Sequence, residues 1–274
     1  MPPAHRSPLV NVMVGAARKA AKSLLRDFAE VEKLQVIAKG QSDFVSQADL
    51  RAEEILRTEL SRVRPDFAWL MEEGGEGGPQ GAGAAWQHRW VVDPLDGTTN
   101  FLHGIPHWAI SIGVEKRAPD GVSEIVAGIV YAPVGDEMFV AEKGGGAFLN
   151  ESRLRVSGRR EMAPALFATG IPFGDIPGKD RFSAILSALM PQVAGVRRFG
   201  AAALDLAWVA AGRYEGYWET GVKRWDIAAG ILLVREAGGF VTAPDEADPY
   251  ETGSVVAANP HLHAKLREIV AGNL

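Results

Sequence analysis

Two aspartates that follow a short apolar run are the residues of this chain best suited to chemistry. The run is Trp90 to Val92, and Asp93-Pro94-Leu95-Asp96-Gly97-Thr98-Thr99-Asn100-Phe101 comes directly after it. Proline donates no backbone hydrogen bond and biases the residue before it toward an extended conformation, so we expect a buried strand to end at Asp93. Two carboxylates in a partly dry site repel each other unless a cation lies between them. Because carboxylate, carbonyl and hydroxyl oxygens suit magnesium, the motif predicts a site for a divalent metal ion.

Two further acid-bearing junctions strengthen this interpretation. Glu72-Glu73 follows the apolar run 67–71, and Trp225-Asp226 opens an amphipathic segment. Taken alone, the D-x-x-D-G pattern could be an Asx turn whose aspartates only cap the backbone. Three acid-bearing junctions at the ends of elements are instead the arrangement that a site with several metal ions needs. The sequence therefore favours metal-dependent chemistry.

These motifs resemble the signatures of a known enzyme family. The block from Asp93 to Phe101, the Glu72-Glu73 pair and Trp225-Asp226-Ile227-Ala228-Ala229-Gly230 are similar to motifs of the inositol monophosphatase family, in the family's order. The resemblance covers nearly the whole chain. It implies an Mg²⁺-dependent phosphomonoesterase that hydrolyses inositol 1-phosphate, a small phosphorylated polyol, to inositol and phosphate with a metal-activated water. It also implies two to three Mg²⁺ ions and a homodimer.

The resemblance assigns the metal ligands residue by residue. The implied ligands of the first ion are Glu72, Asp93 and the backbone carbonyl of Leu95. Those of the second ion are Asp93, Asp96 and Asp226. A looser third ion would lie beside Asp49, with weaker matches at Asp43 and Glu73. The implied catalytic residues are Glu72, Thr98 and Asp93, of which Glu72 and Thr98 would orient and deprotonate the water.

The resemblance also implies which groups hold the substrate. Backbone amides of Gly97 and Thr98 would contact the phosphate, an approach that a Cβ at position 97 would block. The remaining substrate positions that it implies are Asp96, Asp226, Gly200, Ala201, Ala202 and Glu219. An alternative for residues 201–203 is a tight helix-packing face. Lys39 lies near a lysine of the family pattern, but its spacing differs by one, so we leave it out of the site.

Other substrates and roles stay open at this point. Within the same superfamily the alternatives are fructose 1,6-bisphosphate, histidinol phosphate, or a nucleotide 3′- or 2′-phosphate. A second phosphate would call for a cluster of Arg and Lys, and Lys223-Arg224 is the nearby candidate. A regulatory binding protein on the same fold is an alternative from another class, but Glu72, Asp93, Asp96 and Asp226 are all present.

Composition bounds the class of protein. The chain has 274 residues, 47% hydrophobic content and a net charge of −5, which suffices for a large core and gives no sign of a nucleic-acid partner. It contains no cysteine, which excludes disulfides and Cys-ligated zinc and permits a reducing cytosol. No apolar run approaches the ~20 residues of a membrane helix, and no signal peptide is recognisable. We therefore expect a cytoplasmic protein without membrane contacts.

The elements that must position these residues follow from local patterns. Ser7-Pro8 predicts the start of a helix that reaches about residue 33, and Ser46-x-x-Asp49 predicts a capping box that opens a second helix. The glycine-rich segment 74–85 fits a mobile flap beside the metal site, with Glu76 nearby, better than a plain linker. Residues 108–149 read as an antiparallel meander, and helices are expected over 201–211 and 225–237. Together they predict an α+β fold, a layered α-β-α-β-α sandwich, with an N-terminal half over 1–156 and a C-terminal half over 157–274.

The family resemblance generates a prediction about lithium. Added LiCl should inhibit phosphate release at a fixed Mg²⁺ concentration, and the measurement is a LiCl titration of the initial rate. NaCl at equal ionic strength is the control. Full activity at high millimolar LiCl would contradict the prediction.

Overall fold

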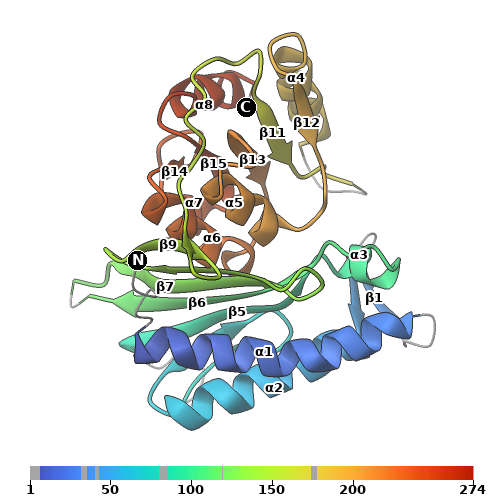
Figure 1. The fold of residues 1–274 in the computed structure, drawn as a ribbon, viewed down its shortest axis with the longest axis vertical. Helices are drawn as coiled ribbons and strands as arrows, with labels where there is room; N and C mark the ends of the chain where they lie inside the picture. The colour runs from blue at the N-terminus through green and yellow to red at the C-terminus, as the bar shows by residue number, and fades with distance from the viewer. Residues whose placement is uncertain are drawn as a thin grey trace.

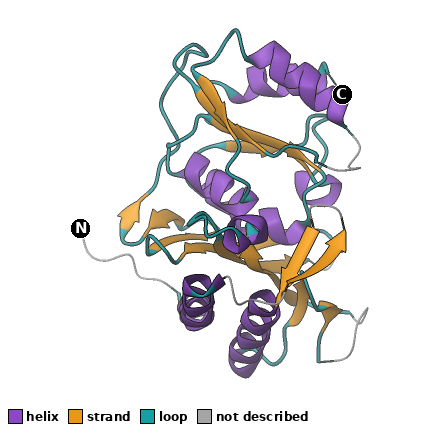
Figure 2. Cartoon of the chain, turned by 90° about the vertical axis from the view of Figure 1, so that its right-hand side faces the viewer, coloured by secondary structure: helices purple, strands orange, loops and turns teal. Residues whose placement is uncertain are grey.

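Five layers of alternating helices and sheets make up the fold, which confirms the predicted α-β-α-β-α sandwich (Figure 1, Figure 2). The computed structural model describes residues 7–31, 36–40, 43–79, 85–118, 120–173 and 178–273, and among them the side chains of 36–40 and 43–45 are left out. The outer helices on one side are α1 (Pro8–Ala29) and α2 (Gln47–Val63). The helices between the two sheets are α5 (Ala202–Ala210) and α6 (Arg224–Glu236). Those beyond the second sheet are α4 (Lys179–Leu189) and α8 (His263–Ala271).

The first two helices begin at the predicted caps. The Ser7 hydroxyl accepts a hydrogen bond from the Val10 backbone N–H at 3.2 Å, and Pro8 occupies the first turn of α1. Ser46 and Asp49 form the predicted capping box of α2. Helix α1 ends at Ala29, earlier than the predicted residue 33. In the described part of the chain, no helix is long and apolar enough to cross a membrane.

The larger sheet has eight strands in the order β10-β9-β8-β7-β6-β5-β3-β4. Their bounds are β3 (Ala68–Met71), β4 (Gly75–Gly77), β5 (His88–Asp96), β6 (Ala109–Arg117), β7 (Ser123–Ala132), β8 (Glu137–Glu142), β9 (Gly146–Leu149) and β10 (Ser152–Arg153). The sheet is covered on both faces: Val91 packs in the core toward α5 and α6, whereas Trp90 and Val92 pack in the core with α1 and α2. Burial on both faces explains the continuous apolar run that precedes Asp93.

Strand β5 does not stop at Asp93 as predicted but continues to Asp96. Its pairing with β6 loses register between Asp93 and Asp96, so Pro94 lies in a bulge, where a missing N–H leaves no ladder bond unmade. Residues three apart on a regular strand face opposite sides of the sheet. The bulge removes this restriction and allows Asp93 and Asp96 to face the same cavity.

The start of the glycine-rich segment is an edge strand, which corrects part of the predicted flap. Strand β4 pairs antiparallel with β3, and the Glu76 carboxylate accepts a hydrogen bond from Arg89 Nη1 at 3.0 Å. Glu76 is therefore held at the sheet and does not line the candidate site. Residues 80–84 lie outside the described residues.

The smaller sheet has five strands in the order β12-β11-β13-β15-β14. Their bounds are β11 (Leu166–Thr169), β12 (Gly195–Arg197), β13 (Gly216–Thr220), β14 (Phe240–Thr242) and β15 (Ser254–Ala258). A separate hairpin joins β1 (Val36–Gly40) to β2 (Asp43–Ser46). The larger sheet ends at Arg153 and the smaller one begins at Leu166, on either side of the predicted division at 156/157. The division into halves stays a prediction.

Small residues set how closely α6 approaches its neighbours. A Cβ on Gly128 of β7 would lie 2.9 Å from the Ala229 Cα, and a Cβ on Gly230 would lie 2.5 Å from Leu206 of α5. Only glycine permits these two contacts. Helix α6 is therefore clamped between the larger sheet and α5, which fixes its first turn and Asp226 within that turn.

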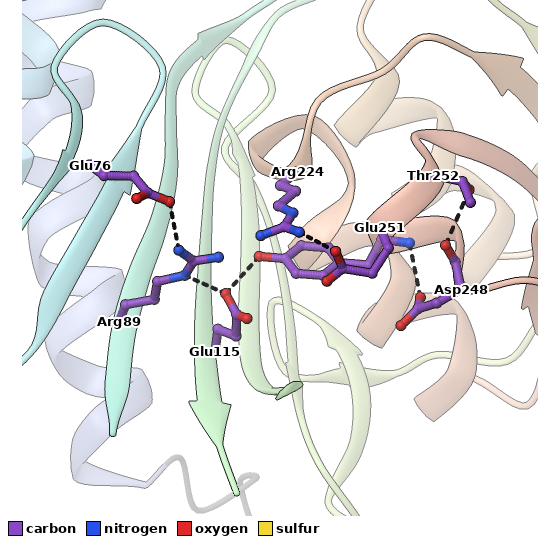
Figure 3. Close-up of polar contacts among 8 residues, drawn as sticks. Glu76, Arg89, Glu115, Arg224, Asp248, Glu251 and Thr252 are labelled. Carbon is purple, nitrogen blue, oxygen red and sulfur yellow. Dashed lines mark hydrogen bonds and ion pairs between the residues drawn. The ribbon is translucent and has the colours of Figure 1, made fainter. Parts of the chain in front are cut away.

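A buried ion pair links the larger sheet to α7 (Pro249–Thr252). Arg89 Nε donates to Glu115 Oε2 at 2.5 Å, and the two side chains are only 5% and 2% exposed (Figure 3). The Tyr250 hydroxyl of α7 donates to the same Glu115 oxygen at 2.9 Å. Glu76 contacts Arg89 from the β4 side (Figure 3). The charges are therefore compensated by groups from two layers.

Replacing Glu115 tests the contribution of this network. Glu115→Ala should lower the free energy of unfolding by about 3–5 kcal/mol, because it removes the buried carboxylate that compensates the Arg89 charge and leaves the exposed Glu76 as the carboxylate beside it. Equilibrium urea unfolding measures the difference. The control is Glu124→Ala, which removes an ion pair to Lys143 whose side chains are 46% and 57% exposed, and it should cost less than ~1 kcal/mol. Equal losses in both variants would contradict the assigned role.

Candidate functional site

The predicted site residues meet around one cavity of about 200 Å³ between the end of β5 and the first turns of α5 and α6. The predicted positions that line it are Glu72, Asp93, Leu95, Asp96, Gly97, Thr98, Gly200, Ala201, Ala202, Glu219 and Asp226. Gly170, Arg198, Asp205 and Val222 complete the described lining. The three acid-bearing junctions recognised in the sequence thus converge, whereas Asp49 and the weaker match Glu73 do not line the cavity.

The bulge of β5 and the glycine after it shape the floor of the cavity. The Asp93 Oδ1 accepts a hydrogen bond from the Leu95 N–H at 2.9 Å, which turns the chain within the bulge. Gly97 has a φ of 92°, in the left-handed region, and precedes α3 (Thr98–Leu102). A Cβ at position 97 would also lie 3.0 Å from the His107 carbonyl oxygen. Both observations require glycine here and leave the Gly97 backbone open to the cavity.

Asp96 is anchored to the start of α5. Its two carboxylate oxygens accept hydrogen bonds from the backbone N–H groups of Ala202 at 3.2 Å and Ala203 at 2.8 Å. Burial raises the pKa of Asp96 to about 7, with a further contribution from the negative charge of Glu72, while the Ala203 amide opposes the shift. The contact joins the end of β5 to α5 and fixes the carboxylate at the cavity wall.

Asp226 and Asp93 are buried in the same negative field. The Lys223 N–H donates to Asp226 Oδ2 at 2.7 Å at the start of α6. Burial and the charge of Asp96 raise the pKa of Asp226 to about 8. Burial, together with the charges of Glu72 and Asp96, raises the pKa of Asp93 well above its ordinary value. These carboxyl groups release their protons at neutral pH only when positive charge compensates them.

The donor set fits a hard divalent cation that keeps part of its water. Among the described residues, no group of three or more acidic, histidine or cysteine side chains is arranged to hold one metal ion. Each of the three aspartates accepts a hydrogen bond from a backbone N–H, so part of each carboxylate already has a protein partner: Asp93, Asp96 and Asp226. Mg²⁺ is usually bound by one or two carboxylates with water and substrate oxygens, so this arrangement suits it. The assignment of ligands to individual ions stays a prediction.

Asp49 contacts Thr98 but does not itself line the cavity. The Thr98 Oγ1 lies 3.0 Å from Asp49 Oδ1 and 3.0 Å from the Leu95 carbonyl oxygen, and its proton can reach either acceptor. Asp49 also accepts hydrogen bonds from the Ser46 N–H and hydroxyl. Its place in the α2 capping box accounts for these contacts, and a third ion beside it stays a prediction. The side chains of Asp43 and Lys39 lie outside the described residues.

The substrate side of the cavity combines core packing with open backbone. Gly200 has a φ of 78°, and Ala201 precedes the first residue of α5. The Ala201 side chain is buried in the core, whereas that of Ala202 is partly exposed. Glu219 reaches the cavity from the end of β13. Helix packing thus explains the alanine at 201, while contacts between these residues and a substrate stay predictions.

Arg198 and Asp205 also line the cavity, although the sequence assigned no definite role to either residue. Arg198 is the one cation among the described lining residues, and its guanidinium lies 5.0 Å from the Phe173 ring centroid. Lys223 and Arg224, the expected cations, do not line the cavity, and Arg224 pairs instead with Glu251 (Figure 3). Burial and the charge of Glu219 raise the pKa of Asp205 well above its ordinary value. The signal available in the sequence was the adjacent pair Arg197-Arg198, but such a pair is equally typical of an exposed surface.

Comparisons with known proteins agree with the geometry. A model of the inositol monophosphatase family matches residues 5–273. An inositol-1-monophosphatase of Rhizobium meliloti (strain 1021) is 52% identical over 267 residues, covering 97% of each chain. A protein of Pseudomonas aeruginosa named Nus factor SuhB is 43% identical, covering 92% of each chain. The crystal structure of the extragenic suppressor protein suhB from Bartonella henselae superimposes with a TM-score of 0.90 at 50% identity, covering 98% of this chain and 100% of that one.

The raised pKa values predict how stability depends on pH and Mg²⁺. In the folded chain Asp96 and Asp226 hold protons up to about pH 7 and 8, whereas an ordinary Asp releases its proton near 3.8. The folded state therefore binds more protons across this window, and the free energy of unfolding in EDTA should fall by several kcal/mol as the pH rises through it. MgCl₂ should remove most of the fall, as measured by urea unfolding below and above the window.

Asp96→Asn is the control for this prediction, because it removes one of the titrating groups. The fall in EDTA should be smaller in the variant than in the wild type. An equal fall in both proteins would show that the pH dependence arises elsewhere.

Proposed function

The chain is an enzyme of the inositol monophosphatase family, and from that premise we propose that it hydrolyses inositol 1-phosphate to inositol and phosphate in an Mg²⁺-dependent reaction. The observation that carries the proposal is the convergence of Glu72, Asp93, Asp96 and Asp226 on one cavity. Such a set of carboxylates would repel a phosphate dianion unless cations lay between them. Phosphoryl transfer depends mainly on positioning and charge compensation, which this cavity is suited to provide.

The proposed ion ligands are the acids and the carbonyl at the cavity floor. Glu72, Asp93 and the Leu95 carbonyl would hold the first Mg²⁺, and Asp93, Asp96 and Asp226 would hold the second, directly or through its bound water. When bound, such ions lower the pKa of water and neutralise charge on the phosphate oxygens. The backbone contacts of Asp93, Asp96 and Asp226 support this role, because they hold each carboxylate in place before any ligand arrives.

Glu72 and Thr98 would handle the proton of the attacking water. The Thr98 proton is directed to Asp49 or to the Leu95 carbonyl, each 3.0 Å from Oγ1. The Thr98 oxygen is then left as an acceptor, which would orient the water with one hydrogen toward Thr98. Glu72 would take the proton that leaves as the water attacks phosphorus.

The remaining lining residues would hold the two halves of the substrate. The exposed backbone of Gly97 and Thr98 would receive the phosphate, and no Cβ at position 97 obstructs that approach. Glu219 would accept a hydrogen bond from a ring hydroxyl, beside Gly200, Ala201 and Ala202. Arg198 stands alone as a cation in the described lining, which supports a monophosphate over a bisphosphate, since a second phosphate calls for several cations.

A second candidate is a regulatory binding role on the same fold. The name Nus factor, carried by the Pseudomonas aeruginosa relative, is the observation that favours it. The presence of all four cavity acids favours an active enzyme, and the two roles are compatible. A homodimer and a cytoplasmic location stay predictions from the sequence.

Replacing Asp93 tests the proposed activity. Asp93→Asn should lower Mg²⁺-dependent phosphate release from inositol 1-phosphate by ~10³-fold or more, because this carboxylate is proposed to contact both ions. Asp120→Asn is a matched control, since the exposed Asp120 accepts the Val122 N–H at 3.0 Å in the same i to i+2 contact that Asp93 makes with Leu95.

A substrate panel defines the specificity in the same assay. Inositol 1-phosphate, fructose 1,6-bisphosphate, histidinol phosphate and a 3′-phosphonucleotide are compared by kcat/KM in MgCl₂. The proposal expects inositol 1-phosphate to give the highest value. Preference for another ester would reassign the substrate, and the absence of hydrolysis from all four would leave the regulatory role.

A further inference from the structure

The Glu219 carboxylate is held by groups from two neighbouring strands. Tyr217 and Glu219 are two apart on β13, so their side chains leave the same face of the sheet. The Tyr217 hydroxyl donates to Glu219 Oε2 at 2.6 Å, and Tyr217 itself is fully buried. Strand β11 runs parallel to β13 with Thr169 opposite Trp218, which brings Gly170 beside Glu219.

The Glu219 carboxylate occupies the space that a side chain at position 170 would take. A Cβ at position 170 would overlap all three atoms of the carboxylate group. The φ of Gly170 is outside the left-handed region, so its backbone conformation does not by itself call for glycine. A side chain at position 170 would therefore displace the Glu219 carboxylate from its present orientation.

The surroundings of Glu219 favour one orientation of a charged carboxylate. Burial raises its pKa, whereas the Tyr217 hydrogen bond, the positive charge of Arg198 and the Gly170 backbone N–H act in the opposite direction. Asp96, Asp205 and Asp226 are the acidic groups that face this region from β5, α5 and α6. A carboxylate fixed between a hydroxyl and a backbone cannot follow substrates of different shape.

We propose that Tyr217 and Gly170 are positioning residues that hold Glu219 turned into the cavity, so that together they set selectivity for phosphate esters of polyols. The inference rests on the proposed phosphatase function and adds two residues that do not themselves contact the reacting atoms. A fixed acceptor discriminates strongly, because an ester without a matching hydroxyl leaves the cavity-facing acceptor position of a buried carboxylate unfilled.

The test compares two substrates in two variants. Inositol 1-phosphate carries ring hydroxyls, whereas p-nitrophenyl phosphate has none. Tyr217→Phe and Gly170→Ala should each lower the ratio of kcat/KM for inositol 1-phosphate to that for p-nitrophenyl phosphate by about tenfold, mainly through KM, because a hydrogen bond to a charged group is lost or displaced. Adding Glu219→Gln to Tyr217→Phe should lower this ratio little further, since both act through one carboxylate.

Tyr250→Phe is the matched control, because the Tyr250 hydroxyl also donates to a buried glutamate, Glu115, away from the cavity. It should leave the ratio unchanged even though it removes a similar hydrogen bond. Thermal unfolding of each variant checks that the fold is kept.

The outcomes separate this inference from the proposed function. If Tyr217→Phe and Gly170→Ala change both substrates in parallel, or if Tyr250→Phe changes the ratio equally, the inference is overturned while the activity stands. If the wild type hydrolyses another polyol phosphate of the panel in place of inositol 1-phosphate, the substrate assignment fails and the same ratio is judged on that ester. If the wild type hydrolyses no polyol phosphate, both are overturned.

Discussion

Mutual repulsion between buried carboxylates is the constraint on which this structure depends. Asp93, Asp96 and Asp226 all have raised pKa values because burial and neighbouring acids disfavour their charged forms. Side chains in such a field would rotate away from one another if they were free to do so. Each is instead tied to a backbone N–H within a bulge or at the start of a helix. The protein thus keeps a cavity in which the repulsion between the carboxylates is relieved by bound cations or, at lower pH, by protonation.

The middle helical layer supplies the rigidity that this arrangement needs. Glycine at 128 and 230 lets α6 lie close to β7 on one side and to α5 on the other. Asp96 reaches across from β5 to the first amides of α5, so the strand, both helices and the cavity share one set of contacts. Substitutions in this layer would therefore disturb the cavity from a distance.

Local signals in the sequence were sufficient for much of the fold and for the acids of the candidate site. Ser7-Pro8 and Ser46-x-x-Asp49 are read within one turn of helix, and both caps formed as predicted. The bulge at Pro94 could not be read in this way, because it depends on the pairing of β5 with β6. Arg198 was left undecided, because an Arg-Arg pair does not show which of its two arginines faces inward. No local pattern in the sequence marks Gly170, because the group that it contacts, the Glu219 carboxylate, belongs to another strand.

The Arg89–Glu115 pair has a consequence for how the molecule comes apart. Arg89 and Glu115 lie in the larger sheet, whereas Tyr250 belongs to α7, which follows the middle helices in the chain. If the C-terminal part separated from the larger sheet, Glu115 would lose the hydrogen bond from Tyr250 while Arg89 remained buried. Partly opened forms are thereby penalised, and the two sheets are expected to melt together as a single cooperative unit despite being formed by separate stretches of chain.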